Sequence, residues 1–414
     1  MARADEPSKA DLADRYRATR RLTLDLLAPL SDADATLQPH PDASPSKWHA
    51  AHTTWFFETF ILRDHVAGYA LYDEKYPFLF NSYYDGEGER HARPNRGMVS
   101  RPSLDQIVAY RQAVDAALLD ALPDLCPEVR RFVDLGIHHE QQHQELILTD
   151  ILWTLSENPL LPAYADGPPI VTDDAPDMGW TRHEGGEVSI GHDGSDFSFD
   201  CERPRHRVLI APFEIADRLI TQGEWAEFMC DGGYSTPSLW LSDGWAWVKE
   251  HGVEAPRYWR RSDDGTWTRF TLAGERPLEP GRPVSHLSYY EADAFARWAG
   301  ARLPTELEWE AAFAGHDPVR GNQLDAAGAV MPHGGDAPFG DCWQWTQSAY
   351  LPYPGFAPEE GTVGEYNGKF MCGQFVLKGA SCATPRGHSR ATYRNFFYPQ
   401  QRWQFTGVRL ARNA

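Results

Sequence analysis

Through about the first 155 residues, apolar side chains recur every three or four positions, which is the spacing of one face of an α-helix. The pattern predicts four helices, at about residues 11–30, from 46 onward, at 103–122 and at 127–157. Ser103 is a candidate N-cap for the third of them. Four helices of this length predict an antiparallel bundle over residues 1–158, and the cores of such bundles commonly hold metal sites built from facing helices.

The rest of the chain has a different texture. Residues 159–180 are rich in Pro, Asp, Gly and Ala, which predicts a linker. Over residues 181–414, Gly, Pro and Trp become frequent, the predicted strands are short, and helical spacing recurs only at 289–299 and 306–313. The expected fold class is therefore α plus α+β, a four-helix bundle followed by a compact domain with many irregular loops.

Composition narrows the class of protein. The chain has 42% hydrophobic residues and a net charge of −20 without a basic run, which argues against nucleic acid or an anionic membrane as the main partner. The first residues lack the apolar core of a signal peptide, and no apolar run approaches the roughly 20 residues of a membrane span. The 6 cysteines are scattered without a C-x-x-C pair, which favours reduced thiols in a soluble cytoplasmic protein.

The fourth predicted helix carries the strongest chemical signal. His139 and His143 are four residues apart, so both can face one metal ion, and neutral imidazoles suit Zn, Fe, Cu or Ni. The same segment contains H-E-x-x-H, the motif of zinc metalloproteases, in which Glu140 would be the general base. A metzincin would have Gly and His at the positions that Leu146 and Thr149 occupy, which disfavours the protease.

Two histidines leave such a site incomplete. His52 is the best third candidate, because Trp48 and Trp55 place its helix in the core, and His49 is its main rival. His138 faces about 100° around the helix from His139 and is expected to be structural. Three neutral histidines with open positions suit a metal that binds a substrate and a small molecule such as O2.

Residues 67–101 connect the second and third predicted helices, and a connection of this length is usually functional or disordered. It contains Tyr83 and Tyr84, which either pack in the core or donate a proton or hydrogen atom beside a redox metal. It also contains Arg90, Arg93 and Arg96, which are either solvated charges or ligands for a substrate carboxylate.

Near the C-terminus, an amide side chain stands beside aromatic residues, at Asn395, Phe396 and Phe397. The segment alone predicts either a core strand or the wall of a site for a cationic ligand. Aromatic faces attract quaternary ammonium groups, and an Asn side chain can bind a carboxylate.

The second domain resembles the sulfatase-modifying-factor, or formylglycine-generating-enzyme-like, fold, which is related to C-type lectins. The resemblance lies in GGEVSIG at 185–191, RLPTE at 302–306, WQWT at 343–346, KGAS at 378–381 and GVRL at 407–410. The first domain resembles a DinB-type four-helix bundle. Joined in this order, the two domains resemble the sulfoxide synthases of ergothioneine biosynthesis over nearly the whole chain.

That resemblance implies a non-haem Fe(II) oxidoreductase that uses O2. It would join the sulfur of cysteine or γ-glutamylcysteine to C2 of the imidazole of hercynine, Nα-trimethylhistidine, and give a sulfoxide. The residues that it implies for iron are His52, His139 and His143. Those for hercynine are Gln142, Asn395, Phe396 and Phe397. The pair Tyr83 and Tyr84 resembles the catalytic tyrosines of the cysteine-using subtype, and Arg93 and Arg96, with Arg90 in reserve, would bind the carboxylate of the thiol substrate.

Two further activities stay open within these resemblances. A synthase that forms a selenium–carbon bond from a selenosugar and hercynine would keep the iron and hercynine residues, and a C-type-lectin-like domain could bind a ligand without chemistry. Formylglycine-generating enzymes themselves bind copper through two cysteines, and the matching positions here are Thr384 and Ser389, which argues against that activity.

Overall fold

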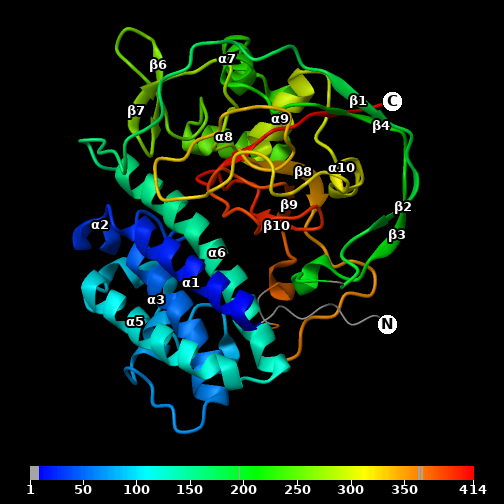
Figure 1. Cartoon of the computed structure of the whole chain (residues 1–414). Coiled ribbons are helices and arrows are strands. Elements are labelled where there is room, and N and C mark those ends of the chain that lie inside the picture. Colours follow the sequence, from blue (N-terminus) through cyan, green and yellow to red (C-terminus); the bar gives the residue numbers. More distant parts are fainter. Residues whose placement is uncertain (1–8, 195, 362–363, 365–366) are drawn as a thin grey trace.

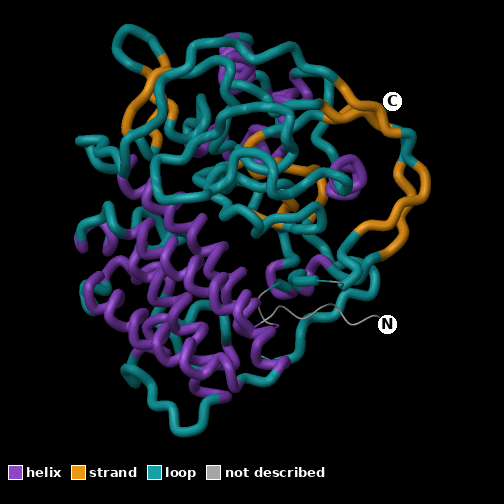
Figure 2. The backbone as a smooth tube through the Cα atoms, viewed as in Figure 1, coloured by secondary structure: helices purple, strands orange, loops and turns teal. Residues whose placement is uncertain are grey.

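The computed structural model describes residues 9–194, 196–361, 364 and 367–414. The N-terminal part is helical, and the C-terminal part combines short strands, helices and long loops (Figures 1 and 2). The four predicted helices are present as α1 (Lys9–Leu27), α3 (Ser46–Phe57), α5 (Leu104–Ala121) and α6 (Pro127–Ser156), together with the short α2 (Asp32–Thr36). The expected order of a helical domain and a mixed domain is confirmed.

Local signals explain where these helices begin. The Ser103 hydroxyl accepts a hydrogen bond from the backbone N–H of Gln106, whose side chain accepts one from the N–H of Ser103, so this capping box starts α5. Pro127 opens α6, where a missing N–H costs nothing. All residues of α3 are buried, and a π-helical turn, η1 (Glu58–Arg63), continues it. Helix α6 packs against both α1 and α3, so the side chains between α3 and α6 lie in the bundle core.

The long segment between α3 and α5 is folded, although it has little regular structure. It forms α4 (Tyr76–Phe80) and two 3-10 turns, η2 (Asp85–Glu87) and η3 (Arg93–Met98). The Trp48 indole N–H of α3 donates to the carbonyl oxygen of Leu79 at 3.1 Å. The segment is therefore held against the helix that carries His52.

The strands of the second domain, within the described residues, form four small sheets. One has the order β10 (Asn395–Phe397), β9 (Phe375–Lys378), β8 (Trp343–Ala349), β11 (Thr406–Gly407), with β11 parallel to β8 and the other pairs antiparallel. The second joins β1 (Trp180–His183), β4 (Phe213–Ala216) and β12 (Ala411–Asn413). The remaining two are the hairpin of β2 (Gly186–Ile190) with β3 (His206–Ile210), and β5 (Trp259–Arg261), β6 (Trp267–Thr271), β7 (Gly274–Pro277).

The second domain has more helices than the sequence pattern indicates. The expected ones are α9 (Tyr289–Trp298) and α10 (Glu306–Phe313), but α7 (Gln222–Cys230) and α8 (Ser242–His251) are helical as well, so the expectation of only two was wrong. The spacing of apolar residues did not indicate α7, although with 9 residues it is one residue longer than α10. The capping box of Thr221 and Glu224 was the signal that could have revealed it.

The two domains share a hydrophobic core. One cluster of buried side chains contains Trp55 and Leu148 of the bundle together with Leu324, Trp403 and Phe405 of the second domain. The expected linker is irregular, yet the Tyr164 side chain is buried and its hydroxyl donates to the carbonyl oxygen of Leu26 at 2.6 Å. In the described parts of the chain, no helix combines the length and apolar character that a membrane crossing requires.

Candidate metal centre and cavity

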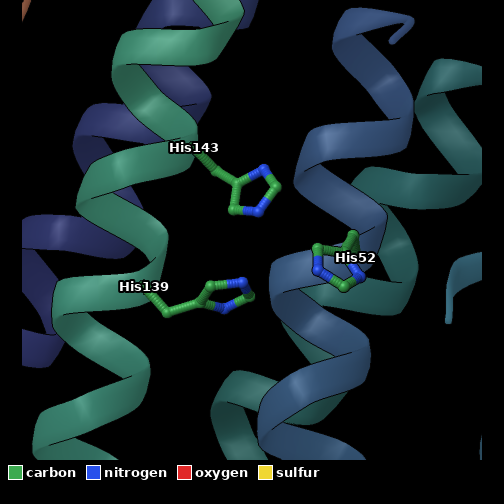
Figure 3. Close-up of side chains that lie close together, drawn as sticks. All are labelled: His52, His139 and His143. Atoms are coloured by element: carbon green, nitrogen blue, oxygen red, sulfur yellow. The ribbon is translucent and has the colours of Figure 1, made fainter. Parts of the chain in front are cut away.

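Three histidine rings face one another across the gap between α3 and α6 (Figure 3). His52 comes from α3, and His139 and His143 come from successive turns of α6. One nitrogen of each ring lies within 4.8 Å of the others, and the ring centroids are 4.7 to 5.0 Å apart. Among the described residues this is the one group of three side chains with such ligand geometry.

Burial keeps these rings in the form that binds metals. It lowers the pKa of His52 and of His143 well below the ordinary value, and it lowers that of His139 to about 4, so all three imidazoles are neutral near pH 7. The carbonyl oxygen of Phe80 lies 2.5 Å from His52 Nδ1, and because a carbonyl only accepts, Nδ1–H donates and Nε2 keeps its lone pair. Three neutral imidazoles fit Fe(II), and they fit other divalent transition metals as well.

A cavity of about 220 Å³ opens beside the three histidines. Both domains line it, so its shape depends on how they pack. The predicted site residues in its wall are His52, Tyr83, Tyr84, Arg93, Arg96, His139, Gln142, His143, Asn395, Phe396 and Phe397.

The loop between α3 and α5 supplies two arginines to this wall. Arg96 is 3% exposed, and its guanidinium donates to the Ser44 and Ser82 hydroxyls at 3.0 Å each while lying 3.4 Å from the centre of the Trp48 ring. Burial, with the nearby Arg93 charge, lowers the pKa of Arg96 to about 9. Among the described residues no carboxylate is ion-paired with it, so the cavity wall contains a buried cation held only by neutral groups.

The two tyrosines of the same loop have different surroundings. The Arg93 guanidinium donates to the Tyr83 hydroxyl, and the Tyr83 ring meets Phe370 of the second domain edge to face at 5.0 Å. Tyr84 is 3% exposed, and its ring lies 5.2 Å from that of Phe60. Both side chains line the cavity, with Tyr83 at the contact between the domains.

Strand β10 contributes an aromatic wall to the same cavity. It pairs with β9, which places Asn395, Phe396 and Phe397 at the edge of the sheet that faces the bundle. The Phe396 ring stacks on Tyr350 at 4.2 Å between centroids. Gln142 of α6 donates from Nε2 to the Tyr393 hydroxyl at 2.7 Å, which joins the helix of His139 and His143 to the second domain.

Not every predicted residue reaches the cavity. Arg90 is exposed, ion-paired with Asp85, and does not line the cavity. His138, which is expected to be structural, stacks on Phe197 at 3.8 Å between centroids and is not part of the three-histidine cluster. His49 is no part of the triad, but its Nδ1 lies 2.8 Å from His143 Nδ1.

Glu140 of the H-E-x-x-H motif is bound by polar residues of the bundle core and is not part of the three-histidine cluster. It is fully buried, and its carboxylate accepts hydrogen bonds from Arg20 and Arg111 at 2.7 Å each and from the Thr23 hydroxyl at 2.5 Å. Burial alone would raise the pKa of Glu140, but the guanidiniums of Arg111 and Arg20 lower it to about 2. The glutamate is engaged in the bundle core and is not placed to act as the general base of a protease.

Sequence reasoning missed the contacts that join α6 to the second domain. Glu145 accepts hydrogen bonds from the Trp343 indole, the Ser381 hydroxyl and the Thr384 hydroxyl, at 2.8, 2.6 and 2.8 Å. Asp150 accepts one from the Trp403 indole at 2.9 Å. Asp150 follows His143 by seven residues, a spacing that puts both on one helix face and could have indicated its position.

The fold and the site define a class: a DinB-type bundle that carries a three-histidine centre and is joined to a formylglycine-generating-enzyme-like domain. The pattern of the DinB superfamily matches residues 15–147, and that of the sulfatase-modifying factor enzyme 1-like domain matches residues 172–337 and 331–414. Thr384 and Ser389 occupy the positions that match the copper-binding cysteines of formylglycine-generating enzymes by resemblance. The Thr384 hydroxyl donates to Glu145, and the Ser389 hydroxyl donates to the carbonyl of Gly379.

Relatives give the family. The chain is 34% identical to a hercynine oxygenase of Mycolicibacterium smegmatis and to one of Mycobacterium tuberculosis, with 98% of this chain and 99% of the relative covered in both cases. It is 27% identical to ergothioneine biosynthesis protein 1 of Schizosaccharomyces pombe, over 54% of this chain and 29% of that protein. The chain belongs to the hercynine oxygenase family, and it is therefore an enzyme of the oxidoreductase class.

Proposed function

We propose that this protein is an Fe(II)- and O2-dependent sulfoxide synthase that joins the sulfur of cysteine, or of γ-glutamylcysteine, to C2 of the hercynine imidazole. The observation that carries the proposal is a three-histidine centre in the wall of a cavity that also holds a buried arginine and an aromatic wall. In the overall reaction the S–H and C2–H bonds break, a C–S bond and an S–O bond form, and the second atom of O2 leaves as water.

His52, His139 and His143 are the proposed iron ligands. Bound there, Fe(II) would supply electrons for the activation of O2 and a positive charge that lowers the pKa of the substrate thiol. The protein contributes neutral rings already close together and a cavity that both domains enclose. A metal ion held by these rings would bind both substrates beside each other, so that the reacting atoms are close together.

The buried arginine supports a thiol substrate that carries a carboxylate. Arg96 bonds only to the hydroxyls of Ser44 and Ser82 among the described residues, so a bound carboxylate would compensate its charge. Arg93 lies in the same wall, whereas Arg90 is exposed and paired with Asp85. We therefore assign the carboxylate to Arg96 and Arg93. A selenosugar has no carboxylate for this pair, which favours a cysteine-type donor over it.

The aromatic wall supports hercynine as the second substrate. The aromatic rings of Phe396 and Phe397, which line the cavity, suit its trimethylammonium group, and the amides of Asn395 and Gln142 can bind its polar groups. Tyr83 or Tyr84 would donate a proton or hydrogen atom during oxygen transfer to sulfur. Tyr83 is the first candidate, because the Arg93 guanidinium can only donate to its oxygen, and the hydroxyl keeps its own hydrogen to donate.

The deciding experiment is anaerobic loading with Fe(II), followed by O2 with hercynine and cysteine and by mass spectrometry of the products. Hercynylcysteine sulfoxide is the expected product. Iron binding without this product would direct the same assay to γ-glutamylcysteine and then to a selenosugar. Ligand binding by the iron-free protein without any turnover would contradict the proposal in favour of a binding protein.

A further inference from the structure

A line of hydrogen-bonded side chains leads from His143 to the second domain. His49 Nδ1 lies 2.8 Å from His143 Nδ1, His49 Nε2 lies 3.0 Å from Asp150 Oδ2, and the Trp403 indole N–H donates to Asp150 Oδ1 at 2.9 Å. His49 and Asp150 are 2% exposed and Trp403 is 5% exposed, so water does not compete for these bonds. The proposed reaction assigns no role to these three residues.

Asp150 determines the direction of the bonds. A carboxylate only accepts, and Asp150 Oδ2 also accepts from the backbone N–H of Ser44 at 2.8 Å. A neutral His49 must therefore carry its proton on Nε2, which leaves its Nδ1 as an acceptor. His143 must then donate from Nδ1–H, so its lone pair is on Nε2. In the reverse direction, the bare Nε2 of His49 would face the carboxylate, and His143 would hold a proton on Nε2.

We propose that His49 and Asp150 are positioning residues that fix the tautomer and ring orientation in which His143 binds iron, and that Trp403 couples them to the docked second domain. The inference rests on the metal centre of the proposed function. Hydrogen-bonded partners of a metal-ligating histidine orient the ring and raise its basicity, and their loss weakens metal affinity by about 10- to 100-fold.

The ring of His52 is oriented by a different kind of partner. A backbone carbonyl, that of Phe80, accepts from its Nδ1, and this partner belongs to the bundle itself. The orientation of His143 depends instead on side chains, and the last of them, Trp403, belongs to the other domain. Correct docking of the second domain therefore strengthens one iron ligand as well as closing the cavity.

The test measures the Kd of Fe(II) anaerobically, by competition with a chromophoric chelator, in the full-length protein. His49→Phe keeps a flat ring and removes both hydrogen bonds, and it should raise the Kd about 10- to 100-fold. His49→Gln offers an amide oxygen toward His143 and an amide N–H toward Asp150, and it should stay within about threefold of the wild type. His65→Phe changes an exposed bundle histidine and should leave the Kd unaltered.

Two variants test the part of the hydrogen-bonded line that lies farthest from His143, at Asp150 and Trp403. Trp403→Phe keeps an aromatic ring but loses the N–H, so the Kd should rise by a smaller factor, about threefold to tenfold. Asp150→Asn can donate to His49 and reverse the bonds, so it should weaken binding about 10-fold or more. Co(II) in place of Fe(II) gives a second readout, because its visible absorption depends on the number and geometry of the ligands.

Circular dichroism shows which variants fold. If His49→Phe does not fold, the Kd values of Asp150→Asn and His49→Gln test the inference. Wild-type Fe(II) affinity in folded His49→Phe or Asp150→Asn would overturn the inference. Equal losses in His49→Phe and His49→Gln would also overturn it, since packing alone would then explain both. A wild-type protein that binds no Fe(II) would instead contradict the metal centre, so the two failures are distinct.

Discussion

Replacing Arg96 by methionine should weaken the binding of the thiol substrate strongly while changing the stability of the fold little. Arg96 is 3% exposed and stacks on Trp48, and among the described residues its hydrogen-bond partners are the hydroxyls of Ser44 and Ser82. Methionine fills a similar volume without a charge. The substitution therefore removes the positive charge that we assign to the substrate carboxylate and leaves the packing of the cavity wall nearly intact.

The effect on stability should be small because opposing contributions have similar size. Burial lowers the pKa of Arg96 to about 9, and keeping the cation there at neutral pH costs about 5 kcal/mol. The substitution relieves this cost. It also removes two hydrogen bonds from a charged donor, at about 1.5 to 3 kcal/mol each, and a stacking contact worth about 2 kcal/mol. We expect the free energy of unfolding to fall by at most about 3 kcal/mol.

The effect on the substrate should be large. Removing one partner of a buried, hydrogen-bonded charge pair costs about 2 to 5 kcal/mol. The lower figure already corresponds to about a 30-fold rise in the KM for the thiol substrate. The KM for hercynine should change little, since the aromatic wall lies on β10.

Steady-state kinetics with each substrate varied in turn, together with thermal denaturation, check both expectations. Arg90→Met is the matched control, because Arg90 is exposed, paired with Asp85 and outside the cavity, and its KM values should stay within about twofold of the wild type. The reasoning is refuted if Arg96→Met leaves the KM for the thiol unchanged, if both KM values rise equally, or if Arg90→Met has the same effect.

Three further substitutions test the other parts of the site. Tyr83→Phe combined with Tyr84→Phe should shift the products from coupled sulfoxide toward cysteine sulfinate, as measured by mass spectrometry, and mostly coupled product would exclude the proposed hydrogen donation. His139→Ala should abolish iron loading, as measured by metal analysis, and iron retained at one equivalent would overturn the ligand assignment. Phe396→Leu should raise the KM for hercynine about 5- to 30-fold through loss of an aromatic ring, while the KM for histidine, which lacks the trimethylammonium group, should change less.

The sequence determined much of the local structure, because local signals act between residues a few positions apart. The spacing of His139 and His143 follows from the helical repeat alone, and the Ser103 capping box marks the start of α5. The same kind of signal, a capping box of Thr221 and Glu224, marks the start of α7, which the spacing of apolar residues did not indicate.

The motifs of residues 185–410 indicated the fold of the second domain by resemblance, and its order after a DinB-like bundle indicated the family. Sequence spacing also named His52 and His49 as rivals for the third ligand. Only the structure separated them: His52 Nδ1 is bound to the carbonyl of Phe80 and its ring faces the other two, while His49 lies behind His143. The two candidates are three residues apart on one helix, so the packing of α3 against α6 determines which of them faces His139 and His143.

Tertiary structure alone decided the rest of the site. It separated Arg96, buried in the cavity wall, from Arg90 on the surface, and it turned Glu140 into the bundle core. It also brought Trp403 to Asp150, although 253 residues separate them. Such contacts depend on how two folded domains pack, and no periodicity within either segment carries that information. The local chemistry can therefore be read from the sequence, whereas the direction in which each charged side chain points is set by the packing of the domains.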